Sequence, residues 1–209
     1  MERSRGITIF SKQAELSTAE TDITLLDTPG HVDFTAEMER TLQVLDYAIL
    51  VISASDRIQA HTKTVWRLLN EYRIPVFLFV NKMDQPGTDK TLILKELKKK
   101  LDASCVDMED PEDIATGDER ALEEYLEAGE VSIDTISQMI ADRQIFPCYF
   151  GAALKLQGVQ ELLDGIGNMW EIMFRLIMIR QIIDYRTVEM LSSLVRVSIR
   201  FPVTLRETG

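Results

Sequence analysis

Apolar runs alternate with amphipathic stretches along most of this chain. Two runs, YAILVISA (47–54) and IPVFLFVN (74–81), are almost continuously apolar, which is typical of parallel strands covered on both faces of a sheet. A third run, IFPCYFGA (145–152), predicts a further strand with a weaker pattern. Nearer the N-terminus, GITIFSKQAEL (6–16) and TDITLLD (21–27) predict two strands that could pair as a hairpin.

Helical patterns lie between these strands. Strands that alternate with helices predict an α/β fold with a doubly wound, mostly parallel sheet. Ligands of such sheets bind at the carboxyl ends of strands, which is where the stretches at Asp27, Asn81 and Gly151 fall. The apolar residues at helical spacing are Phe34, Met38, Leu42 and Leu45 in one stretch and Val65, Leu68, Leu69 and Tyr72 in another.

Composition narrows the class of protein. With 209 residues, 45% of them hydrophobic, the chain can bury a sizeable core, and one domain with a short appendage is expected. The apolar runs are far shorter than the roughly 20 residues that cross a bilayer, and no signal peptide pattern is present, so a cytoplasmic protein without a membrane partner is predicted. Cys105 and Cys148 lie far apart without a C-x-x-C pattern or a nearby histidine, which predicts two ordinary buried thiols.

The net charge of -11 is concentrated in one segment. Residues 102–142, called the acidic segment below, contain fourteen acidic residues and one basic residue, Arg120. One interpretation is a solvated helical insert with alternating faces. The other is an electrostatic face that repels phosphate and selects a basic partner. Under either interpretation the segment is a poor candidate for contact with RNA, and sequence-specific DNA is not an expected partner.

Polar residues follow the apolar run that ends at Val80. Asn81, Lys82 and Asp84 emerge together from the end of a predicted strand. A carboxylate there can accept two hydrogen bonds from the N1–H and the exocyclic amine of guanine, which adenine cannot supply. Because an unpaired buried polar group costs more than a lost apolar contact, such a site would discriminate strongly between the two bases. The alternative interpretation of this stretch is an ordinary polar turn.

The stretch DTPGHVDF (27–34) groups two acids with a histidine. A metal-dependent hydrolase could use Asp27, His31 and Asp33 as ligands, but it would need a further ligand from elsewhere. The other histidine, His61, opens a predicted helix and is expected to be a surface or capping residue. No G-x-S-x-G motif supports Ser/His/Asp catalysis.

Four short motifs together resemble a known family. RGITI (5–9), DTPGHVDF (27–34), NKMD (81–84) and FGAAL (150–154) occur in the order and approximate spacing of the second to fifth nucleotide motifs of translational GTPases of the elongation factor G class. The resemblance covers residues 1–166. It implies a G domain with the P-loop NTPase-like fold, which binds GTP and Mg²⁺ and hydrolyses GTP on the ribosome as part of a translation factor.

The sequence between these motifs resembles one branch of the family more than the others. The stretches 59–89 and 121–130 are similar to the tetracycline-resistance ribosomal protection proteins. This similarity implies a role in antibiotic resistance through the ribosome, with elongation factor activity as the other possibility within the family.

The family resemblance implies a role for each matching residue around the phosphates. Thr8 and Asp27 would hold Mg²⁺, and Gly30 would bring its backbone N–H to the γ-phosphate. The catalytic residues would be His31, which orients the attacking water, and Ile7, which forms part of an apolar gate beside it. Phosphoryl transfer requires mainly positioning and charge stabilisation, so no covalent nucleophile is needed.

The resemblance also implies a guanine site at the ends of two strands. Asp84 would bind the base edge, and the backbone near Ala153 would bind its carbonyl oxygen. Ala152 stands where the family often has serine, so a backbone contact survives there but a side-chain contact does not. The nucleotide-binding residues implied in this part of the chain are Asn81, Lys82, Asp84, Gly151, Ala152 and Ala153.

The sequence departs from the family at both ends. None of its ten glycines is followed by lysine, so the phosphate-binding motif G-x-x-x-x-G-K-S/T is absent, and we expect a sheet that lacks its first strand and phosphate loop. Residues 167–209 form an unassigned tail, explained either by a shifted reading frame or by a divergent helix. We therefore expect weak GTP binding and marginal stability for 1–209. A nucleotide-binding or interaction module without hydrolysis is the alternative to a GTPase.

Overall fold

A computed structural model describes residues 12–17, 22–27, 42 and 45–169. The described residues fall into two compact units: 12–17, 22–27 and 42 belong to the first and 45–169 to the second. The predicted helix around 34–45 is described only at Leu42, which is helical, and at Leu45, which is not.

The first unit contains a β-hairpin. Strand β1 (Lys12–Ser17) pairs antiparallel with β2 (Asp22–Asp27), from Lys12 opposite Asp27 to Ser17 opposite Asp22. The predicted hairpin is therefore confirmed for these residues. The beginning of the predicted first strand, 6–11, lies outside the described residues.

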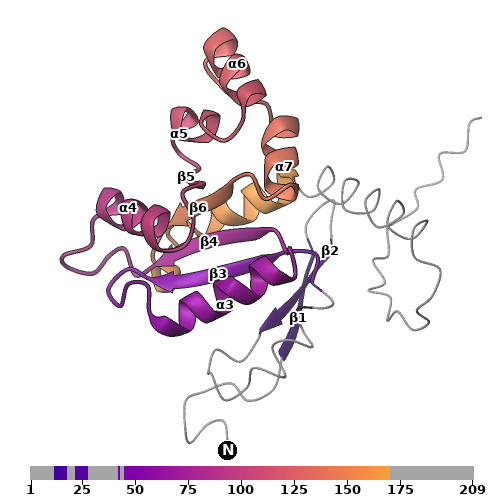
Figure 1. Cartoon of the computed structure of the whole chain (residues 1–209). Coiled ribbons are helices and arrows are strands. Elements are labelled where there is room, and N and C mark those ends of the chain that lie inside the picture. The colour runs from indigo at the N-terminus through magenta and orange to yellow at the C-terminus, as the bar shows by residue number, and fades with distance from the viewer. Residues whose placement is uncertain (1–11, 18–21, 28–41, 43–44, 170–209) are drawn as a thin grey trace, which may run out of the picture. The chain divides into compact units, whose positions relative to one another are not determined.

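The second unit is built on a parallel sheet with the strand order β3-β4-β6-β5 (Figure 1). Every neighbouring pair in it is parallel, and helices connect successive strands, so the predicted doubly wound α/β fold is confirmed. Its strands are β3 (Ala48–Ser53), β4 (Val76–Asn81), β5 (Cys105–Asp107) and β6 (Phe146–Phe150). The helices between β3 and β5 are α3 (Ala60–Glu71) and α4 (Lys90–Lys100).

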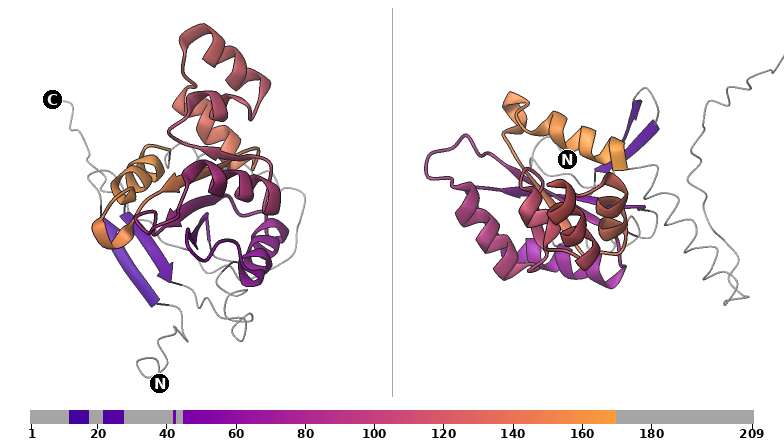
Figure 2. Two further views of the ribbon diagram at one scale, coloured as in Figure 1. Left: turned by 90° about the vertical axis from the view of Figure 1, so that its left-hand side faces the viewer. Right: turned by 90° about the horizontal axis from the view of Figure 1, so that it is seen from above.

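Helices cover both faces of this sheet. Figure 2 shows α3 and α4 on one side and the helix of residues 159–169 on the other. Trp66 of α3 is buried and packs edge-on against Phe146, with ring centroids 4.8 Å apart. On the other face, Leu162 and Ile166 belong to the same buried cluster as Phe77 of β4. Because β4 is buried from Val76 to Val80 and successive side chains point to opposite faces, it supplies apolar side chains to both faces of the sheet.

The two long apolar strands differ in their surroundings. Strand β4 is buried from Val76 to Val80, as predicted for a strand covered on both faces. Strand β3 contradicts that prediction, because Val51 is 59% exposed and most of its other residues are only half-buried. Within the described residues, β3 pairs with one strand, β4.

The acidic segment is built into the core. It supplies β5 and three helices, and its residues Ile114, Ala121, Met139 and Ile140 are buried in the same cluster as Phe77. Figures 1 and 2 show α6 as the helix of this segment farthest from β4. The interpretation of the acidic segment as a solvated helical insert therefore applies only to the charged faces of its helices. The three helices are α5 (Pro111–Ala115), α6 (Glu119–Ala128) and α7 (Ile133–Ala141).

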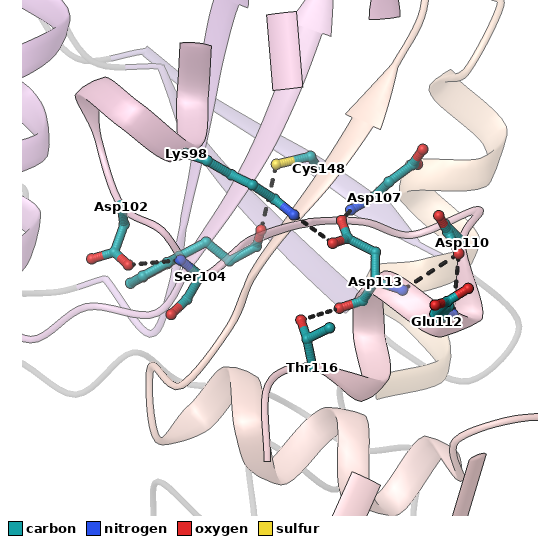
Figure 3. Close-up of polar contacts among 10 residues, drawn as sticks. Lys98, Asp102, Ser104, Asp107, Asp110, Glu112, Asp113, Thr116 and Cys148 are labelled. Carbon is teal, nitrogen blue, oxygen red and sulfur yellow. Dashed lines mark hydrogen bonds and ion pairs between the residues drawn. The ribbon is translucent and has the colours of Figure 1, made fainter. Parts of the chain in front are cut away.

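Lysines of α4 neutralise the innermost carboxylates of the acidic segment. Lys98 pairs with the Asp113 carboxylate, which also accepts a hydrogen bond from the backbone N–H of Asp107 at 2.8 Å (Figure 3). Lys90 pairs with Asp107 at 2.7 Å and with Glu109. The segment is thus tied to α4 by charge as well as by burial.

The two cysteines lie in the second unit. Cys105 and Cys148 are both buried free thiols, as predicted, and burial raises the pKa of Cys148. Among the described residues, no helix is both long enough and apolar enough to cross a membrane.

Candidate nucleotide-binding site

The candidate site begins where β4 and β6 end side by side. The two strands are paired in register up to Val80 and Phe150, so the segments that follow them leave the sheet together. The backbone N–H of Gly151 donates to the Val80 carbonyl, and the N–H of Met83 donates to the Gly151 carbonyl, each at 2.9 Å. These bonds join the NKMD and FGAAL stretches directly.

Asn81 connects the two stretches through its side chain. Its Oδ1 accepts hydrogen bonds from the backbone N–H of Lys82 at 2.8 Å and of Ala153 at 2.9 Å. Ala153 lies 72 residues further along the chain. Asn81 is half-buried, and a buried N–H left without an acceptor costs about 1–3 kcal/mol. The asparagine therefore fixes the position of the 151–153 backbone relative to the end of β4.

A third strand end joins the site. The backbone N–H of Ala54, just after β3, donates to the Asn81 carbonyl at 2.8 Å. Lys82 adopts a positive φ of 65°, which turns the chain sharply after β4. Its Nζ lies 3.7 Å from the carboxylate of Asp56 in the turn that follows β3. The ends of three parallel strands thus meet at one edge, where ligands of such sheets bind.

Asp84 presents an exposed carboxylate at this edge. Its Oδ2 lies 2.8 Å from Nζ of Lys155. The hydrogen bond from Lys155 is the main cause that lowers the pKa of Asp84, with the charge of the lysine acting in the same direction. Asp84 is therefore ionised at neutral pH and can accept hydrogen bonds at both oxygens.

The loop after β6 closes tightly on itself. Ala152 and Gln157 exchange two backbone hydrogen bonds of 3.0 and 3.2 Å. A Cβ on Gly151 would lie 2.1 Å from the Gln157 carbonyl oxygen, so only glycine fits there. Gly158 combines a positive φ of 73° with a similarly close approach to the Phe150 carbonyl.

The closed loop presents apolar side chains to solvent beside Asp84. Leu154 is fully exposed, and Leu156 is 76% exposed. Lys155 lies between them in the short 3₁₀ turn Ala153–Lys155. Phe150, at the start of the loop, lies under the ammonium of Lys90 at 5.0 Å from its ring centroid, which anchors the loop to α4.

The structure brings together all six residues predicted to bind guanine. Whether they bind guanine stays a prediction. Of the residues predicted to surround the phosphates, Ile7, Thr8, Gly30 and His31 lie outside the described residues. Asp27 is the last residue of β2, and its side chain is not described.

His61 differs from its prediction. Helix α3 begins at Ala60, one residue earlier than expected, so Gln59 is the N-cap and His61 lies within the first turn. The histidine is half-buried, and its Nδ1 is buried with no hydrogen bond to the described residues. It is therefore neither a cap nor a fully exposed residue.

Within the part of the chain that the structure describes, no three metal-ligating side chains come together.

Sequence reasoning missed Lys155, Asp56 and Gln157 as neighbours of the site. Gly151 and Gly158, which flank the loop, were a usable indication of close backbone contact. Nothing in the sequence pattern indicated that Lys155 would pair with Asp84, because that contact depends on how the loop closes.

Comparisons with known proteins show which proteins this chain resembles. Residues 1–171 match the family model described as the elongation factor Tu GTP binding domain. Tetracycline resistance protein TetW of Butyrivibrio fibrisolvens is 32% identical over 192 residues, which cover 82% of this chain and 30% of the relative. TetM of Neisseria meningitidis is 33% identical over 189 residues, which cover 80% of this chain and 30% of the relative. The chain thus spans about 30% of the length of these relatives.

A solved structure supports the fold. A crystal structure of a protein from Thermus thermophilus superimposes with a TM-score of 0.68 over 80% of this chain and 33% of that chain. The sequence identity is 21%, so this likeness concerns the fold alone.

Proposed function

Because the chain belongs to the family of the elongation factor Tu GTP binding domain, we propose that it recognises the guanine base in a GTP-hydrolysing domain of a translation factor. The observation that carries this proposal is the hydrogen bond from the Ala153 N–H to Oδ1 of Asn81, because it joins the two stretches predicted to bind the base. Asp84 then lies on the same edge as the backbone of 151–153.

Guanine complements this arrangement. Its N1–H and exocyclic amine can each donate to one oxygen of the ionised Asp84 carboxylate. Its carbonyl oxygen would be a second acceptor for the Ala153 N–H, which already donates to Oδ1 of Asn81. Adenine carries no N1–H, and its amine lies where guanine has the carbonyl. The site therefore favours guanine through paired polar groups.

The residues proposed for hydrolysis are ones whose side chains the structure does not describe. In the roles that the motif order supports, Thr8 and Asp27 hold Mg²⁺, since hydroxyl and carboxylate oxygens suit this ion. The ion would neutralise charge on the phosphates. Gly30 offers a backbone N–H to the γ-phosphate, His31 orients the attacking water, and Ile7 shields it.

We further propose that a longer protein containing this domain acts on the ribosome in the cytoplasm. The support is the similarity to relatives whose names describe tetracycline resistance, together with the motifs shared with ribosome-dependent GTPases. Ribosomal protection against tetracycline is the more specific form of this proposal.

The guanine assignment is tested by Asp84→Asn in a chimera that carries a phosphate-binding segment ahead of residue 1. An amide at this position can donate to the C2 carbonyl of xanthine but cannot accept both guanine donors. We expect GTP affinity to fall by at least about tenfold, since hydrogen bonds to charged groups contribute about 1.5–3 kcal/mol each, and binding of xanthosine triphosphate to increase.

The control is Asp164→Asn, which makes the same chemical change on the exposed surface of the helix of residues 159–169. Competition binding with the two nucleotides measures the preference of each variant. An unchanged preference in Asp84→Asn would remove Asp84 from the base site.

A further inference from the structure

Lys155 approaches Asp84 from a loop whose shape is set by backbone contacts. Its own N–H donates to the Ala152 carbonyl at 2.9 Å, and Ala152 is in turn paired with Gln157. The next residue, Leu156, has a positive φ of 57° and ends the 3₁₀ turn. Because the backbone on both sides of Lys155 is bonded in this way, the lysine is presented to the carboxylate by the loop itself.

The lysine uses an oxygen that the proposed base also requires. Its Nζ lies 2.8 Å from Oδ2 of Asp84, at ordinary hydrogen-bond distance. Guanine would take both oxygens of this carboxylate, one through N1–H and one through the exocyclic amine. A base with N1–H alone, such as hypoxanthine, would take one oxygen and leave the other to the lysine.

We propose that Lys155 is a specificity-determining residue that competes with the exocyclic amine of guanine for the Asp84 carboxylate. This inference rests on the proposed guanine site. Before the base binds, the ammonium occupies Oδ2, and binding of guanine displaces it into solvent. Hypoxanthine binds without displacing it. Lys155 therefore lowers the affinity for guanine and narrows the preference for guanine over hypoxanthine.

The size of the effect follows from the exposure of the pair. The side chains of Lys155 and Asp84 are 57% and 29% exposed, so the pair is screened by water. Ion pairs of this kind change an equilibrium constant by up to about fivefold. Loss of the competitor should tighten guanosine binding by roughly twofold to fivefold and leave inosine binding unchanged.

The test uses the 209-residue chain and two nucleosides, guanosine and inosine. Uncharged nucleosides isolate the base from any effect of the lysine charge on phosphates. The variant is Lys155→Met, which keeps the length of the side chain and removes the charge. Chemical shift titrations that follow the amides of Met83 and Ala153 report binding at the site.

Two further variants serve as controls. Lys155→Arg keeps the cation and should bind both nucleosides as the unaltered chain does. Lys99→Met makes the same chemical change at an exposed position in the last turn of α4 and should also leave binding unchanged. Higher salt screens the ion pair, so it should strengthen guanosine binding to the unaltered chain and have no effect in Lys155→Met.

The outcomes separate this inference from the proposed function. A guanosine affinity that is unchanged in Lys155→Met, or an equal gain for inosine, would overturn the role of Lys155 while guanine recognition stands. If guanosine shifts neither amide in any variant, the guanine site itself is refuted, and the role of Lys155 is refuted with it. A selective gain for guanosine supports both.

Discussion

Replacing Gly151 by alanine should open the loop that the proposed site depends on. The φ of Gly151 lies outside the left-handed region, so alanine brings no backbone strain of its own. Its Cβ, however, would lie 2.1 Å from the Gln157 carbonyl oxygen and 3.1 Å from Cα of Gly158. Both neighbours are backbone atoms, so no side-chain rotation can relieve the contact.

The expected cost follows from the two ways in which the loop can respond. It can keep its shape and accept an overpacked contact, which costs about 1–3 kcal/mol. It can also separate and lose the two hydrogen bonds between Ala152 and Gln157, which contribute about 0.5–1.5 kcal/mol each. The cheaper response determines the result, and both estimates indicate that Gly151→Ala destabilises the domain by about 1–3 kcal/mol.

Equilibrium unfolding in urea measures this cost, and the amide shift of Ala153 reports whether its bond to Asn81 survives. The matched control is Gly167→Ala, in the helix of residues 159–169, where a new Cβ meets no atom within 4 Å. There we expect a gain of up to about 1 kcal/mol, because alanine favours the helix. Equal stabilities of Gly151→Ala and the unaltered chain would show that the loop is not closed as described.

Two further predictions concern other parts of the chain. Glu124 accepts hydrogen bonds from the Thr135 hydroxyl and the Ser132 N–H, with the Thr135 bond as the main cause that lowers its pKa to about 2. A folded-state pKa below the ordinary 4.5 means that Glu124 stabilises the fold above pH 4.5 and loses this contribution as the pH falls toward 2. Glu124→Gln should therefore lower the urea midpoint at neutral pH and weaken its acid dependence, and equal acid dependence in both proteins would contradict this. In the phosphate-loop chimera, His31→Ala should leave GTP affinity nearly intact and reduce ribosome-stimulated hydrolysis, as measured by phosphate release, whereas a parallel loss of affinity would indicate a structural histidine.

The sheet was predictable because its strands are unusually apolar. The runs around Ile52 and Phe77 predict strands of a parallel sheet, and the strand ends at Asn81 and Gly151 follow from where each run stops. Parallel pairing then brings these ends to one edge. The meeting of the NKMD and FGAAL stretches was therefore predictable in outline.

Features that depend on tertiary contacts were not predictable in this way. Strand β5 has only three residues, and the aspartates around it mask its apolar pattern. The exposure of Val51 depends on which elements pack against its face of β3, and the apolar pattern of a single strand does not contain that information. Lys98 and Asp113 are fifteen residues apart and lie in different elements, so their pairing depends on the packing of α5 beside α4.

Hydrogen bonds among the described residues hold the proposed base site together. Bonds within 45–169 position Asn81, Lys82 and the 151–153 backbone. The residues proposed for hydrolysis lie before residue 32, in a different part of the sequence. Base binding and hydrolysis should therefore respond independently to mutation: changes at Asp84 or Lys155 should alter which base is bound, and changes at His31 should alter turnover. For this reason nucleoside binding, which requires no phosphate anchor, is the most direct measure of what this part of the chain does.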